Sequence, residues 1–92
     1  MNKEGFEQYL RNVKKYTEKS IRSRISRAYW IEDTFGVDLD KIVSNENETL
    51  SYREKIYSQA ATAKYAGSLY NALRGYYEYK NGETLPRRND SI

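Results

Sequence analysis

The sequence contains no cysteine and no histidine, and it has only one proline and five glycines among 92 residues. Without cysteine there is no disulfide framework and no thiolate metal site, which fits a reducing cytoplasm. Without histidine the chain lacks the commonest general base, the commonest metal ligand, and the Ser-His and Cys-His pairs. The glycines are scattered, so no glycine-rich phosphate loop is present. We therefore expect a protein that is not an enzyme, with no catalytic residue, metal or cofactor.

Long apolar runs are also missing. No stretch is apolar enough to cross a bilayer, and the N-terminus lacks the apolar region of a secretory signal, so we expect a cytoplasmic protein with no membrane partner. Aromatic residues make up 14% of the chain and the apolar positions are periodic, which favours a folded protein over a disordered one. At this length one domain is expected, covering residues 1–86, with residues 87–92 as a linker or frayed tail.

The longest periodic segment covers residues 62–82 and predicts an amphipathic helix. Thr62 is suited to cap its start, and Asn81 followed by Gly82 is a strong stop signal. Its apolar stripe consists of Tyr65, Ala66, Leu69, Ala72, Leu73, Tyr76 and Tyr77.

The remaining segments also have helical spacing. We expect helices over residues 2–13, where Gly5 weakens only the start, over 18–35, and over 45–59, with a short helical turn over 39–43. Thr17 and Asp38 are suited to cap two of these segments, and Gly36 to end one. No segment shows the period-two alternation of a strand. The sequence predicts an all-α fold, a four-helix bundle with a short extra helical turn, whose buried residues include Leu10, Ile25, Ala28, Leu69, Leu73 and Tyr76.

The charge is mildly basic overall, at +3, but it is unevenly distributed. Residues 11–30 carry seven basic residues and one acidic residue, a net charge of +6. Residues 31–54 carry seven acidic residues and two basic ones, a net charge of −5. The basic end could steer a polyanion to one surface, or could simply be a solvated helix. The spacing of Asp38, Asp40, Glu46 and Glu48 fits no calcium loop and favours helix starts.

One face of the 62–82 helix is polar and contains two glycines. At about 100° per residue this face consists of Lys64, Gly67, Ser68, Asn71, Arg74 and Gly75. A glycine inside a helix costs roughly 1 kcal/mol relative to alanine, so the pair suggests close approach by another backbone, such as a nucleic acid. The alternative is a solvated face with two tolerated glycines. Trp30 likewise falls opposite the apolar stripe of its helix, which favours packing on a neighbouring element over contact with a partner.

Two segments together resemble the core-binding domain of tyrosine recombinases, the phage-integrase family. The first is KKYTEKSIRSRISRAYWIEDTFG, in which Thr17 precedes a basic helix, after an aromatic-leucine pair at Phe6 and Leu10. The second is SLYNALRGYYEY, a long helix of small, leucine and aromatic residues. The similarity extends to about Arg87 and consists of helical patterns rather than an invariant motif.

The resemblance implies a four-helix SAM-like bundle that clamps one side of duplex DNA. The implied DNA face is the first half of the second helix and the early part of the last, which corresponds to Lys19, Ser20, Arg22, Ser23, Thr62, Lys64, Ser68 and Asn71. Charge adds Lys14, Lys15, Arg27 and Arg74 to the candidate DNA-binding residues. The family's Arg/His constellation and tyrosine nucleophile belong to a separate catalytic domain, so none of the ten tyrosines is a candidate nucleophile.

Two functions therefore remain as hypotheses. The first is a non-catalytic DNA-binding module: a domain of a recombinase, a truncated prophage remnant, or a protein that reuses the fold for binding alone. The second is a mobile-element-encoded protein-interaction module, such as an inhibitor, an adaptor or a homodimer. Its partner, which could be a recombinase catalytic domain, would contact Trp30, the surface tyrosines and the acidic segment.

Overall fold

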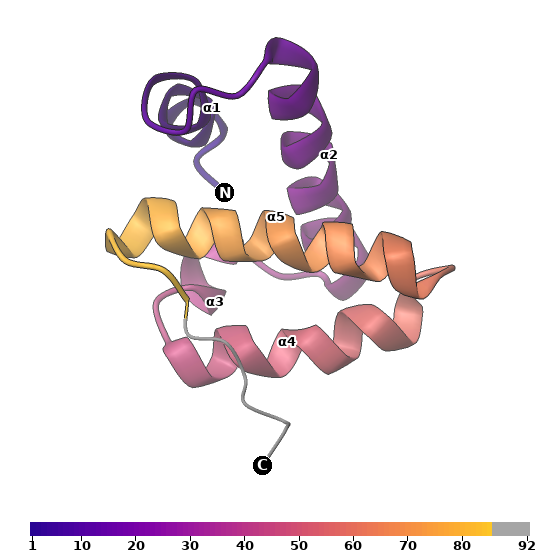
Figure 1. Ribbon diagram of the computed structural model, residues 1–92. Coiled ribbons are helices and arrows are strands. Elements are labelled where there is room, and N and C mark those ends of the chain that lie inside the picture. Colours follow the sequence, from indigo (N-terminus) through magenta and orange to yellow (C-terminus); the bar gives the residue numbers. More distant parts are fainter. Residues whose placement is uncertain (86–92) are drawn as a thin grey trace.

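The computed structural model describes residues 1–85, and over that range it is all-helical with no strand (Figure 1). The helices are α1 (Lys3–Asn12), α2 (Glu18–Phe35), α3 (Leu39–Ile42), α4 (Glu46–Gln59) and α5 (Ala63–Asn81). The all-α prediction is confirmed, and the helices begin and end within a residue of the predicted ranges. The predicted tail, 87–92, lies outside the described residues. No helix in residues 1–85 has the length and apolar character needed to cross a membrane.

Local capping explains why these boundaries were predictable. The Thr17 hydroxyl accepts a hydrogen bond from the Ser20 amide at 3.2 Å, and the Thr62 hydroxyl accepts one from the Tyr65 amide at 3.1 Å. Gly36 and Gly82 end α2 and α5 in the left-handed conformation, with φ of 63° and 72°. Glycine adopts this conformation without steric cost, so each helix ends where its sequence signal lies.

Helix α5 is the central element of the fold. It packs against each of the other four helices, and Figure 1 shows it lying across α2, with α1 on one side and α4 on the other. The six residues predicted to be buried are at most 6% exposed. One member of the predicted α5 stripe is instead on the surface: Tyr65 is 40% exposed, and Tyr57 of α4 is similarly 37% exposed. Both lie next to the connection between α4 and α5, where the core ends.

The domain continues past the end of α5. Leu85 is fully buried in the core, although the sequence around it shows no periodicity.

Gly5 does more than weaken the start of α1, so the sequence prediction for this residue was incomplete. A Cβ atom at Gly5 would overlap the Tyr79 hydroxyl and lie 2.7 Å from Asn2 Nδ2, so α1 and α5 meet closely at this residue.

The acidic segment is held by the N-terminus and by α5. The Met1 ammonium lies 2.9 Å from Glu32 and 3.2 Å from Asp38, and the Lys80 ammonium lies 3.4 Å from Asp40. The hydroxyl of Tyr76 donates to Asp40 and accepts from the Asn2 amide, which lies 2.7 Å away. These contacts compensate part of the negative charge that the sequence places in residues 31–54.

Candidate nucleic-acid interface

The twelve predicted DNA-binding residues do not form one cluster. The structure divides them into three groups by their place in the fold. The first lines a groove between α1, α2 and α5 and contains Lys14, Asn71 and Arg74. The second covers the connection before α2 and this helix as far as its middle, and it contains Lys15, Lys19, Ser20, Arg22, Ser23 and Arg27. The third covers the first half of α5 and contains Thr62, Lys64 and Ser68.

The first group shares a cavity of about 250 Å³ with residues that were not predicted. We call this cavity the central groove; the polar side chains that line it include Tyr9, Lys14, Arg24, Asn71, Arg74 and Glu78. Three cationic side chains and one carboxylate therefore converge there, and two of them, Lys14 and Glu78, are 64 residues apart in the sequence. The net charge of this lining favours an anionic ligand.

Glu78 is the only acidic side chain that residues 1–85 contribute to the central groove. Its Oε1 atom accepts a hydrogen bond from the Tyr9 hydroxyl at 2.7 Å and one from the Lys14 ammonium at 3.1 Å. The Tyr9 hydrogen bond holds the pKa of Glu78 below its usual value, and Lys14 acts in the same direction. Burial and the bond to Glu78 raise the pKa of Tyr9 to about 12. At neutral pH Glu78 is therefore ionised and Tyr9 donates to it.

The two arginines of the central groove form no ion pair with a described carboxylate, although Arg74 contributes to the lowered pKa of Glu78. Among residues 1–85, no acidic side chain lies within ion-pairing distance of Arg24 or Arg74. The Arg24 guanidinium lies over the Tyr16 ring, 4.3 Å from its centroid, and its Nε donates to the Ser20 hydroxyl at 3.4 Å. This stacking fixes the guanidinium at the groove while leaving it able to bind an anion.

Sequence reasoning did not select Arg24 as a site residue, although it counted toward the basic segment. Arg24 lies four residues after Ser20, so both occupy the flank of α2 that turns toward its neighbours, and both are half-buried. The four-residue spacing between Ser20 and Arg24 is the sequence pattern that could have indicated Arg24 as a site residue. The tyrosine beneath the guanidinium comes from the preceding connection, and no local pattern relates the two.

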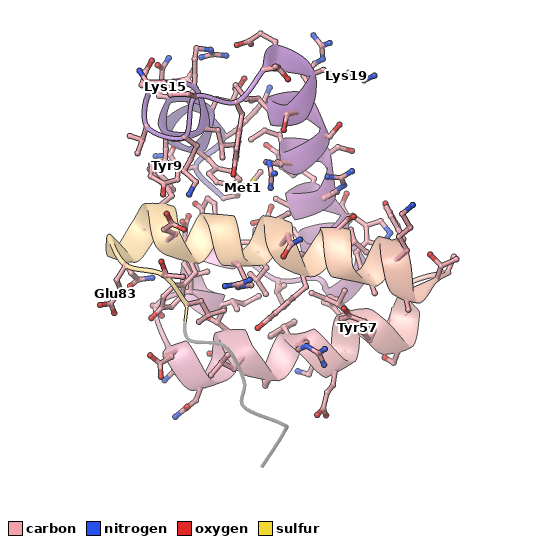
Figure 2. All side chains as sticks on the ribbon, in the orientation of Figure 1. Met1, Tyr9, Lys15, Lys19, Tyr57 and Glu83 are labelled. Atoms are coloured by element: carbon pink, nitrogen blue, oxygen red, sulfur yellow. The ribbon has the colours of Figure 1, made fainter. Side chains whose placement is uncertain are left out.

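Only half of the second group is exposed to solvent, namely Lys15, Lys19 and Arg22. Figure 2 shows Lys15 beside α1 and Lys19 beside the start of α2, both on the side of the molecule away from α4. Lys19 and Arg22 are exposed, whereas Ser20, Ser23 and Arg27 are half-buried on the flank of α2. Lys15 adopts a positive φ of 61°, which is uncommon for a residue with a side chain. This conformation turns the chain from α1 into α2.

In the third group, two hydroxyl groups that the sequence suggested for DNA contacts already form hydrogen bonds with the backbone of α5. The Thr62 hydroxyl accepts the capping hydrogen bond of α5, and the Ser68 hydroxyl donates to the Lys64 carbonyl at 3.4 Å. The glycines of this face have neighbours within the protein. A Cβ atom at Gly67 would lie 3.4 Å from the Tyr57 hydroxyl, and one at Gly75 would lie 3.6 Å from Phe6 Cζ. Both glycines are therefore next to side chains of this protein.

Trp30 is half-buried and packs on aromatic rings, as the packing interpretation predicts. Its ring centroid lies 6.1 Å from that of Phe35 and 6.4 Å from that of Tyr65, both in edge-on arrangements. This contact joins the second half of α2 to the first turns of α5.

We expect the fluorescence of Trp30 to report this packing. The emission maximum of the folded protein should lie at shorter wavelength than that of the urea-unfolded chain, because aromatic rings cover part of the indole. Tyr65→Ala should move the maximum toward the unfolded position, since it removes one of those rings. A native emission maximum at the unfolded position would contradict the packing and favour Trp30 as a contact surface.

The described residues contain no group of three or more acidic side chains that could hold a metal ion. The starts of α3 and α4 contain Asp38, Asp40, Glu46 and Glu48, as the helix-start interpretation predicts.

Comparisons of the chain with protein-family models, with curated proteins and with solved structures find no match.

Proposed function

We propose that this protein is a non-catalytic module that binds duplex DNA through α2, α5 and the groove between them. We also propose that its four longer helices correspond to the SAM-like bundle of tyrosine recombinase core-binding domains, with α3 as an additional turn. The observation that carries the proposal is the central groove, where Lys14, Arg24 and Arg74 converge beside Asn71.

The distribution of charge around the groove supports the same proposal. Three carboxylates of the acidic segment pair with the Met1 ammonium or with Lys80, near α3. Lys19 and Arg22 are exposed at the start of α2, beyond the groove. A polyanion that approaches α2 and the near face of α5 therefore meets mostly basic and neutral side chains.

The residue types suit backbone contacts more than base readout. Lysine and arginine neutralise phosphates, and serine and threonine bond phosphate oxygens, which positions a protein without reading sequence. Asn71 is exposed and its amide is suited to contact adenine. We therefore propose modest sequence discrimination, with Asn71 as its source.

The test is a titration of fluorescent duplex with the protein and with single variants at low and moderate salt. Lys19→Ala and Arg22→Ala should each weaken binding to all duplexes similarly and flatten the dependence of log affinity on log salt by about one unit. Asn71→Ala should instead reduce discrimination at one base pair by roughly 1–3 kcal/mol. Lys41→Ala is the control, because Lys41 is exposed in α3 within the acidic segment. Equal losses from Lys41→Ala and Lys19→Ala would remove the DNA proposal.

A second candidate function is a protein-interaction module, and one observation favours it. Tyr57 and Tyr65 are exposed next to the connection between α4 and α5, and Tyr65 contacts the half-buried Trp30. Aromatic residues of this kind are favoured at protein interfaces. Binding through this patch would depend little on salt, and it would be lost in Tyr57→Ala and Tyr65→Ala while Lys19→Ala left it unchanged.

A further inference from the structure

The central groove contains one feature that general DNA binding does not explain. Beside two arginines and a lysine it includes an ionised glutamate, Glu78, which already pairs with that lysine. A surface selected only for binding a polyanion would gain nothing from a carboxylate at its centre. The presence of Glu78 in the groove therefore requires a separate explanation.

A phosphate group matches the donors of the groove. The groove offers several possible hydrogen-bond donors to phosphate oxygens: the guanidinium groups of Arg24 and Arg74, the Lys14 ammonium, the Asn71 amide and the Tyr9 hydroxyl. A volume of about 250 Å³ holds a phosphate with part of its sugar and is below the size of typical drug-sized pockets. Arginine recognises phosphate through its planar donor pair, and Arg24 is held in place by Tyr16.

Glu78 has the position of a competing anion. Its carboxylate accepts from Tyr9 and Lys14, two of the donors that a phosphate would use. An incoming phosphate would therefore have to share or displace these bonds and would also meet the negative charge of Glu78. Both effects weaken the contact without abolishing it, because Arg24 and Arg74 remain available.

We propose that the central groove seats one phosphate of the duplex backbone, and that Glu78 acts as an internal competitor that limits the affinity of this contact. The inference rests on the proposed function and assigns one of its phosphate contacts to named residues. The proposed ligand is a phosphate within the duplex and not a free phosphate ion, which would enter the same groove.

The test compares duplex affinities of single variants by fluorescence anisotropy at about 0.1 M salt. Arg74→Gln should weaken binding about five- to tenfold, since one phosphate contact carries a salt slope of about −0.9. Glu78→Gln should tighten binding about fivefold, because it removes the competing charge and keeps an oxygen acceptor for Tyr9. A variant that fails to fold cannot bind more tightly, so the gain in Glu78→Gln excludes misfolding as its cause.

Matched controls come from α4, which lies on the other side of α5 from α1 (Figure 1). Arg53→Gln and Glu46→Gln make the same charge changes there and should alter affinity by less than twofold. If each control matches its groove variant, the effects reflect net charge alone and the groove assignment is wrong. Duplex binding by the parent protein that Arg74→Gln and Glu78→Gln leave unchanged would overturn the groove assignment only, whereas no duplex binding at all would overturn the proposed function.

A further titration separates the two sources of phosphate. Inorganic phosphate, added at constant ionic strength in place of chloride, is followed by the NMR signals of the Arg24 and Arg74 side chains. We expect these signals to move with duplex and to show no saturable change with millimolar inorganic phosphate. Saturation by inorganic phosphate, together with unchanged duplex affinity in Arg74→Gln, would assign the groove to a free anion and overturn the backbone contact.

Discussion

Replacement of Leu73 by alanine is expected to lower the free energy of unfolding by about 2–5 kcal/mol. Leu73 is fully buried in the middle of α5, the helix that contacts all the others. The substitution removes buried methyl groups and leaves a cavity that the surrounding helices cannot fill without moving. Urea unfolding followed by circular dichroism measures the loss.

The matched control for this prediction is Leu50→Ala on α4. Leu50 is only half-buried and packs at the edge of the core, so the same chemical change should cost clearly less there. A loss well under 1 kcal/mol for Leu73→Ala, or equal losses at both positions, would show that Leu73 does not occupy the centre of the core.

Two glycine-to-alanine substitutions are expected to have opposite effects. Gly5→Ala should destabilise the fold by about 1–3 kcal/mol, because its Cβ would overlap the Tyr79 hydroxyl. Tyr79 cannot move away freely, since its ring packs against Phe6, Tyr9 and Tyr76. Thermal or urea unfolding of the two single variants, measured without DNA, gives both values.

Gly75→Ala should stabilise the fold by up to about 1 kcal/mol. Its Cβ would make an ordinary contact with Phe6, and alanine is the better helix former. Both glycines lie in helices, so helix propensity alone would predict stabilisation in both variants. A stabilised Gly5→Ala protein would therefore contradict the close meeting of α1 and α5 at this residue.

The helices could be predicted from the sequence because their signals are local. Thr17, Thr62, Gly36 and Gly82 act within one turn of their own positions, and each has the predicted role. The stripe on α5 identified its buried face for the same reason. The prediction of burial is wrong only at Tyr65, where the periodic pattern continues beyond the end of the core.

The missed features depend on residues far apart in the sequence. Gly5 is constrained by Tyr79, and the acidic segment is held by Met1 and Lys80. Leu85 is buried without any periodicity around it. Such contacts depend on how the helices pack, which no local pattern specifies.

The candidate site was predictable only in part. Lys14, Asn71 and Arg74 were selected and do share one groove, whereas Arg24 and Glu78 were not selected and complete it. Charge and helical phase identify basic surfaces along single helices. They do not show which side chains from different helices converge, and that convergence is what gives the groove its electrostatics.

The most direct test of the central claim is the affinity of the unmodified protein for duplex DNA measured across a range of salt concentrations. Binding through phosphates predicts that log affinity falls linearly with log salt, with about −0.9 in slope for each phosphate contact. We expect a few such contacts, and so a slope of roughly −2 to −4 with weak binding at physiological salt. No binding at low salt, or an affinity that does not change with salt, would contradict the account and favour the protein-interaction module.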